Sequence, residues 1–403
     1  MTYLANRGRV RLKGQDLDCQ LNLDNPSRAH ITIKTGASDF SLNDQLDNQL
    51  DFVSGVLDNG LTFTALDNKF VKSNFSIVDF TTTHQYEAGF VIIGKREKSL
   101  EDLKFTRLDL RVPDLIKFTT MSAYQASKLS EITNKPKTTE VLYAGKDFRV
   151  DLEVMGIFVP SLEDKLEEDQ LALPQETILT IESHEPRPLA YLYEKFERLM
   201  KLVEMSTSIA FRPDQVLAYD GTQNYQVLVR SDKELAKTID PKDQDRWIVL
   251  PEFIYNGDLG QYFAKYDKFV KVLDPYIEAR KLWEKQDLAF QMAALAVDRF
   301  YGAFKGDKDT FEERLKDLTF IEEGLAFNTL VSPEDFPGLM AKTRSYYETY
   351  TGDCPVREED LTAYIKVILG ILDYYILEEL GFKSQHAKQN ILIKRWGTVT
   401  EDD

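Results

Sequence analysis

The sequence of 403 residues has only two cysteines, Cys19 and Cys354, and they stand far apart. Two such residues cannot build a disulfide framework or a cysteine-based zinc site. No apolar run approaches the roughly 18 residues that a membrane-spanning helix needs. The first residues also lack the apolar stretch of a secretory leader. We therefore expect a soluble protein of the reducing cytoplasm that makes no membrane contact.

The chain has fewer basic residues than acidic residues. The chain has 50 Lys and Arg residues against 67 Asp and Glu residues, which gives a formal net charge of −17 at pH 7. Because affinity for nucleic acid comes largely from cations that neutralise phosphates, most of this surface should repel RNA and DNA. Any nucleic-acid chemistry would then need a local basic site or a cleft between two copies of the chain.

Motifs for the common cofactors and metals are absent as well. The run Gly89–Lys95 spells GxxxxGK, but Arg96 follows where a phosphate-binding loop has Ser or Thr. There is no HExxH, no EF-hand loop and no G-x-S-x-G elbow. The four histidines have no sequence neighbours that would complete a metal site or a triad: they are His30, His84, His184 and His386. We expect no cofactor and no metal ion.

A period of two dominates the chain up to about residue 182. Residues 107–112 (RLDLRV) and 148–154 (FRVDLEV) alternate apolar and charged side chains, which predicts half-buried strands. Shorter runs of the same type include FSIVDFTTT at 75–83 and EAGFVIIGK at 87–95. Many short strands separated by turn residues indicate a sandwich or an irregular barrel.

The period then changes to that of a helix. The apolar residues between 189 and 203 are spaced by three and four, which predicts an amphipathic helix after Pro188. Two more strand-like runs precede residue 252, and from residue 256 onward helical spacing prevails, with Pro275 expected to kink or break one helix. We predict an α+β protein: a β-sandwich-like region at 1–252, a helical bundle at 256–385 and a tail at 386–403.

Several segments resemble a known family. In the helical half these are LAFQMAALAVDRFYG at 288–302, MAKTRSYYETY at 340–350 and LTAYIKVILGILDYYILEELG at 361–381. This half resembles the HEPN domain of the ApeA type. The β-rich half resembles the N-terminal domain that accompanies it, through VLDNGLTFTAL at 56–66 and RPLAYLYEKFERLMKLVEM at 187–205.

The resemblance implies antiphage defence by abortive infection, with the HEPN bundle acting as a metal-independent RNA endonuclease. Such domains dimerise and bring two Arg-x4–6-His motifs into one cleft. There the His transfers the proton of the RNA 2′-OH or of the leaving oxygen, and the Arg stabilises charge on the phosphate.

The chain departs from this motif. Arg344 stands where the motif arginine belongs, but Thr349 and then Tyr350 occupy the place of the histidine. Neither replaces an imidazole near pH 7. Arg344 can hold a phosphate or simply pair with Glu348 four residues on. Asp298 matches an acidic residue on an inner helix of related bundles, or is a polar edge of its helix. His386 could reach a dimer cleft from beyond the last long helix.

Three functions remain open at this point. The first is an RNase-type HEPN protein whose catalytic site, formed by Arg344, Thr349, Tyr350 and Asp298, is either degenerate or completed in an unconventional way. The second is a catalytically inactive protein whose β-rich half senses a phage or host protein. The third is a ligand-binding β-sandwich with the bundle as scaffold. The apolar side chains of residues 365–376 exceed what one bundle face needs, so we also predict a homodimer through the helical domain.

Overall fold

The structure of the chain is a computed structural model, and it divides into two compact units. The β-rich unit comprises residues 1–116, 121–196 and 212–235, and the helical unit comprises residues 117–120, 197–211 and 236–403. The residues that the structure describes are 6–12, 14–25, 28–36, 43, 46, 48–97, 99–119, 121–122, 124–126, 132–134, 138–156, 175–230, 246–306, 308–319, 332 and 334–396.

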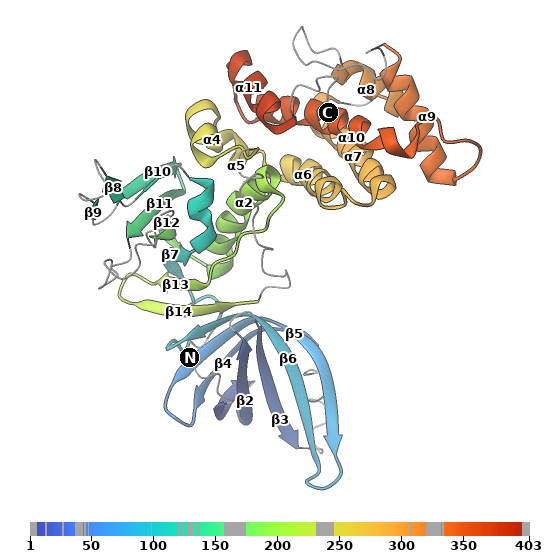
Figure 1. The fold of residues 1–403 in the computed structure, drawn as a ribbon. Coiled ribbons are helices and arrows are strands. Elements are labelled where there is room, and N and C mark those ends of the chain that lie inside the picture. Colours follow the sequence, from blue (N-terminus) through green and yellow to red (C-terminus); the bar gives the residue numbers. More distant parts are fainter. Residues whose placement is uncertain are drawn as a thin grey trace, which may run out of the picture. The chain divides into compact units, whose positions relative to one another are not determined.

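The β-rich unit is built around a closed ring of six antiparallel strands, drawn in blue to cyan in Figure 1. The strands are β1 (Asn6–Leu12), β2 (Gln15–Asn25), β3 (Arg28–Gly36), β4 (Leu50–Leu57), β5 (Thr62–Ser76) and β6 (Thr81–Ile93). Pairing runs from β1 through β2, β3, β6, β5 and β4 and returns to β1. The irregular barrel, one of the two forms that the strand pattern allowed, is therefore the one found.

Side chains of alternate residues fill the inside of this ring. Leu21, Ile31, Val53, Phe63 and Tyr86 come from five different strands, and each has 0 % exposure. This follows from the pleat of a strand, which sends every second side chain to the same face. The period of two in the sequence thus records the inward-facing half of the ring.

Six further strands extend the sheet from β6. Strand β14 (Asn224–Val229) pairs with the end of β6, and the order continues through β13 (Gln215–Tyr219), β7 (Phe105–Arg111), β12 (Gln175–Arg187), β11 (Phe148–Gly156) and β10 (Thr138–Ala144). A short 3-10 helix, η1 (Pro113–Phe118), follows β7, and β8 (Tyr124–Ala126) and β9 (Ile132–Asn134) form a separate pair. The run FSIVDFTTT was predicted as one strand, but Ile77–Phe80 form the turn between β5 and β6.

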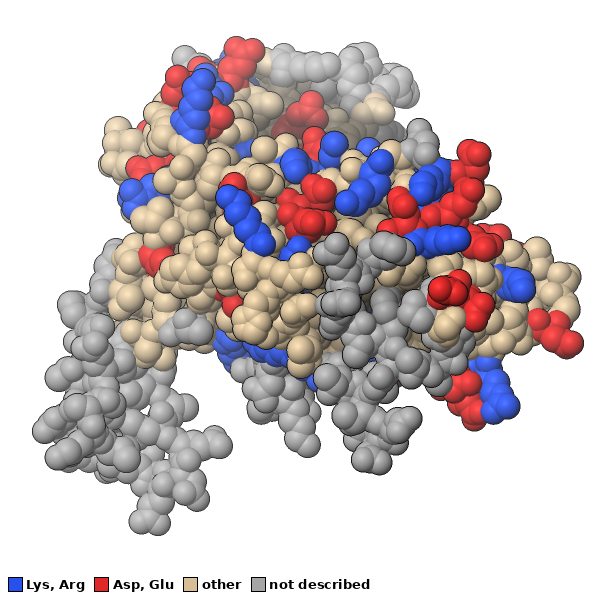
Figure 2. All heavy atoms as spheres, turned by 90° about the horizontal axis from the view of Figure 1, so that it is seen from above, with Lys and Arg blue, Asp and Glu red and all other residues tan. Residues whose placement is uncertain are grey.

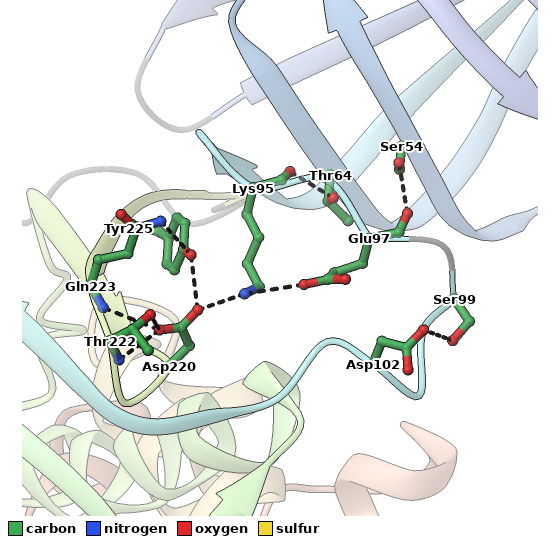
Figure 3. Close-up of polar contacts among 10 residues, drawn as sticks. All are labelled: Ser54, Thr64, Lys95, Glu97, Ser99, Asp102, Asp220, Thr222, Gln223 and Tyr225. Atoms are coloured by element: carbon green, nitrogen blue, oxygen red, sulfur yellow. Dashed lines mark hydrogen bonds and ion pairs between the residues drawn. The ribbon is translucent and has the colours of Figure 1, made fainter.

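A polar cluster fastens the ring to the extended sheet just after β6 (Figure 3). Lys95 Nζ lies 2.6 Å from Asp220 Oδ2 and 3.2 Å from Glu97 Oε1. Asp220, in the turn between β13 and β14, also accepts hydrogen bonds from the Thr222 hydroxyl at 2.6 Å and the Tyr225 hydroxyl at 2.8 Å. The Lys95 and Asp220 side chains are only 11 % and 12 % exposed. An ion pair so fully hydrogen-bonded can hold its place away from water.

The helical unit contains the second half of α2 (Leu189–Thr207) and the helices that follow β14. These are α4 (Leu250–Asn256), α5 (Leu259–Ala264), α6 (Tyr266–Lys281), α7 (Gln286–Phe300), the π-helical turn η4 (Tyr301–Lys305), α8 (Phe311–Thr319), α9 (Phe336–Thr349), α10 (Glu358–Glu379) and α11 (Gln385–Trp396). The predicted α+β class is confirmed. Helix α2 begins directly after Pro188, as predicted. Helix α6 runs unbroken through Pro275. None of the described helices is both long and apolar enough to span a membrane.

The region predicted as a tail from residue 386 contains α11 instead. Arg395 of this helix has a 2 % exposed side chain, and its Nε lies 3.0 Å from Asp373 Oδ2 on α10. Trp396 Nε1 donates to the same carboxylate oxygen at 2.8 Å, and the Tyr276 hydroxyl of α6 donates to Asp373 Oδ1 at 2.6 Å. One buried carboxylate thus joins three helices, which a sequence pattern could not reveal.

The apolar side chains of α10 are buried within a single chain. All of the side chains on which the predicted dimer rested are buried, at 9 % exposure or less: Ile365, Ile368, Ile371, Leu372, Tyr375 and Ile376. They pack against the other helices of the same unit. This removes the physical reason for a homodimer through the helical unit.

The Asp220 cluster should make the β-rich unit sensitive to acid. Burial alone would raise the pKa of Asp220, but hydrogen bonds from Lys95, Thr222 and Tyr225 outweigh it and hold that pKa well below its usual range. Its contribution to stability is therefore present above about pH 3.9, the pKa in the unfolded chain, and is lost as the pH falls further. We expect Asp220→Asn to lower stability by about 2 kcal/mol at pH 7.

Thermal unfolding followed by far-ultraviolet circular dichroism measures this difference between wild type and variant. The gap in melting temperature should shrink below about pH 4. The matched control is Asp102→Asn, because Asp102 is exposed and accepts one hydrogen bond from Ser99 at 2.8 Å. Equal effects of the two substitutions would contradict the assignment.

Candidate functional site

Asp298 is the centre of the candidate site. It lies near the end of α7, and its two carboxylate oxygens bind two arginines from two other helices. Arg314 Nη1 of α8 is 2.8 Å from Asp298 Oδ1, and Arg344 Nη1 of α9 is 2.6 Å from Asp298 Oδ2. The two residues proposed separately from the sequence, Asp298 and Arg344, are therefore brought into direct contact. Arg314 was not predicted.

Packing of the helices places these groups. Helix α7 buries a largely small-residue stripe that includes Ala289, Ala293 and Ala296, which allows close approach of its neighbours. Asp298 follows the buried Val297 and emerges at the edge of this stripe, with a 16 % exposed side chain. The Arg344 guanidinium also lies 4.9 Å from the centre of the Phe311 ring at the start of α8. Both hydrophobic and ionic contacts thus hold α8 and α9 against α7.

The charges of the site are balanced. Arg344 Nε is 2.9 Å from Glu348 Oε1, so the predicted pairing one helical turn away is present. Burial alone would lower the pKa of Arg344, but hydrogen bonds with Asp298 and Glu348 outweigh it and raise that pKa above its ordinary value. Arg314 also donates to the backbone oxygen of Lys308 through Nε and Nη2, at 2.9 and 2.6 Å. Two cations thus face two carboxylates, and both guanidiniums are engaged.

Thr349 and Tyr350 end α9. The Thr349 hydroxyl donates to its own helix, to Ser345 O at 3.0 Å, and lies 2.8 Å from the Thr351 hydroxyl. Tyr350 adopts a left-handed conformation with φ 52° as the C-cap, and its hydroxyl is 3.3 Å from Asp287 Oδ2. Desolvation and the charge of Asp287 raise the pKa of Tyr350. Neither side chain can exchange a proton readily near pH 7.

No imidazole accompanies Arg344. The only histidine of the helical unit is His386, on α11, where Nε2 contacts Asn390 Nδ2 at 3.2 Å. Helices α11 and α9 lie at opposite ends of the helical unit in Figure 1. Among the described residues there is also no group of three or more His, Cys, Asp or Glu side chains that could hold a metal ion. The site can therefore bind charge, but its described side chains include no proton donor or acceptor suited to neutral pH.

The surface charge agrees with the acidic composition. On the face shown in Figure 2, blue Lys and Arg side chains lie among red Asp and Glu side chains. The described residues of this face form no extended basic area of the kind that binds an RNA backbone.

Removing the bridging carboxylate tests how the site is held together. We expect Asp298→Asn to destabilise the helical unit by about 2 kcal/mol, because two partly buried arginines lose their shared anion. Glu348→Gln is the matched control. Its carboxylate is 56 % exposed, and the loss should stay below about 1 kcal/mol. Urea unfolding followed by tryptophan fluorescence reports on this unit, since Trp247, Trp283 and Trp396 all belong to it. Losses of the same size would contradict a central role for Asp298.

Comparison with known proteins adds one finding. No curated protein and no solved structure matches the chain. A protein family does match, described as ApeA N-terminal domain 1, and the match covers residues 6–265. It includes every described strand and all of α2, α4 and α5. Because this is well over half of the chain, the protein belongs to the ApeA N-terminal domain 1 family.

Proposed function

We propose that the chain is an ApeA-like antiphage-defence protein whose helical unit is a HEPN-type bundle without effective RNase activity. In this role the bundle serves interaction, and the β-rich unit senses a phage or host protein. Membership of the ApeA N-terminal domain family supports the defence context. The main support for a loss of catalysis comes from the end of α9. There Thr349 stands in place of the motif histidine, and its hydroxyl donates a hydrogen bond to its own helix.

The engaged state of Arg344 supports the same proposal. An arginine that stabilises a phosphate needs free N–H groups directed at the ligand. Here Nε and Nη1 are directed at Glu348 and Asp298. A phosphate would have to compete with both carboxylates, in a chain whose net charge is already −17.

A second candidate, a weak RNase, is favoured by one observation. Arg314 and Arg344 hold the two oxygens of one carboxylate, at 2.8 and 2.6 Å, in an arrangement that could also take two oxygens of a phosphate. This candidate keeps Arg344 and Asp298 as site residues and RNA as substrate. The ligand-binding reading has no comparable support, because the described side chains of the ring fill its interior.

The decisive experiment restores the missing group. We expect wild-type protein to cleave single-stranded RNA weakly or not at all in the presence of EDTA. Thr349→His should raise cleavage by about 10²–10⁴-fold, the usual contribution of a general acid or base. Adding Arg344→Ala to this variant should abolish the gain. The rates are measured with a labelled RNA near pH 7, and circular dichroism checks that each variant is folded.

A matched control separates restoration of the motif from the mere presence of an imidazole. Ser345→His places the same side chain at an exposed position of α9 directly after Arg344, outside the Arg-x4–6-His spacing, and we expect it to remain inert. Measurable wild-type cleavage that Arg344→Ala abolishes would favour the weak RNase. A folded Thr349→His variant without activity would mean that the bundle lacks more than its histidine and acts as a scaffold.

A further inference from the structure

The turn between β5 and β6 carries the main concentration of exposed apolar side chains. Of the twelve large apolar side chains that are exposed among the described residues, five fall between positions 71 and 80. We call these five the apolar tip: Val71 (48 % exposed), Phe75 (56 %), Ile77 (75 %), Val78 (94 %) and Phe80 (67 %). The other seven are scattered along the chain. A concentration of exposed apolar side chains in one hairpin end is the kind of surface that marks a contact site.

The apolar tip is held in a defined conformation. The β5–β6 ladder continues to its end, where Ser76 pairs with Thr81, so the hairpin is formed up to the turn. Lys34 Nζ of β3 lies 2.6 Å from Asp79 Oδ2, which ties the turn to a third strand. A contact surface that is already ordered loses less conformational entropy on binding.

The backbone conformation of Phe80 also points to a functional role for the turn. Its φ is 48°, in the left-handed region that a bulky side chain rarely adopts. Glycine or asparagine would relieve this strain and would also remove an exposed aromatic ring from water. Backbone strain and exposure of the ring both cost free energy, which points to a contact between this ring and another molecule.

We propose that the apolar tip docks against the apolar tip of a second copy of this chain, forming a two-fold symmetric dimer. In such a contact the same patch serves both partners, so the surface needs only to complement itself. The contact lies in the β-rich unit and does not depend on whether the bundle cleaves RNA.

Area supports this occupant. The exposed fractions of the five side chains correspond to roughly 500 Å² of apolar surface at typical side-chain areas. Two copies would bury on the order of 1,000 Å², the lower limit of specific protein interfaces. This predicts a reversible dimer with a dissociation constant in the micromolar range. The apolar side chains of α10 cannot supply such a surface, because they are buried within one chain.

The local charge also permits this occupant. Most of the surface of one copy should repel another, since the net charge is −17. The segment 69–80 is an exception, because it contains Lys69 and Lys72 against the single anion Asp79, and Asp79 is already paired with Lys34. A second copy that docks at the apolar tip therefore meets lysines and not the acidic surplus, and these long side chains can extend away from the contact into water. Added salt should not dissociate the contact, because it screens the remaining repulsion between the copies.

Sedimentation velocity of the full chain between about 1 and 100 µM tests the proposal, in a range set by the expected interface size. Wild type should shift from monomer towards dimer and should keep the dimer when NaCl is raised. The double substitution Ile77→Ser with Val78→Ser should raise the dissociation constant at least about tenfold, since both side chains lie in the exposed turn. The control is Leu100→Ser, at an isolated site in the same unit that is 46 % exposed, and it should leave the dimer unchanged.

A cross-link identifies the surface independently. In the Val78→Cys variant, a short bis-maleimide should join two copies, because the two-fold axis brings each position 78 close to its symmetry mate. Wild type reports any background from Cys19 and Cys354. A wild-type chain that remains monomeric at 100 µM would overturn the proposal and leave the tip for a different protein or a lipid surface. A dimer that persists in the double variant would also overturn it.

Discussion

Strand β6 is the element on which the β-rich unit depends. On one side it pairs with β5 along its whole length, and on the other it pairs first with β3 and then, over its last residues, with β14. The closed ring and the extended sheet therefore share a single strand.

An ion pair joins the two parts just beyond this strand. Lys95, two residues after the end of β6, is held by Asp220 on the extended sheet. Its own backbone oxygen accepts a hydrogen bond from Thr64 of the ring at 2.9 Å. Because the lysine and the aspartate are both largely out of water, each is stabilised there by the other, together with Glu97 on the lysine and the two hydroxyl groups on the aspartate.

Patterns of local origin were readable from the sequence. The alternating runs at 107–112 and 148–154 became β7 and β11, and the helix after Pro188 became α2, since side-chain periodicity reflects burial directly. Of the two effects expected of Pro275, the break does not occur, because the loss of one hydrogen bond counts less than the packing of its buried neighbours Val272 and Tyr276. The 75–83 run was misjudged because apolar residues normally indicate burial, whereas here they occupy an exposed turn.

The candidate site shows the same limit. Arg344 and Asp298 were singled out by resemblance, but their contact and the participation of Arg314 depend on how three helices pack. Arg314 stands sixteen residues from Asp298 in a segment that shows only an ordinary charged helix pattern. No local signal marks it. The burial of the α10 side chains within one chain was likewise unknowable without the fold, so the homodimer predicted from their apolar excess loses that support and stays a prediction.

Two aspartates of the helical unit play the same structural part, and the difference in their exposure to solvent bears on function. Asp373 and Asp298 each bridge helices through a carboxylate bound to arginine, but Asp373 has 0 % exposure while the Asp298 side chain is 16 % exposed. Asp373 is saturated by Arg395, Trp396 and Tyr276, so no solute can compete for it. At Asp298, water reaches the arginines on either side, and an anion could displace the carboxylate. The exposure thus separates a sealed bridge at Asp373 from a bridge at Asp298 that dissolved anions can reach.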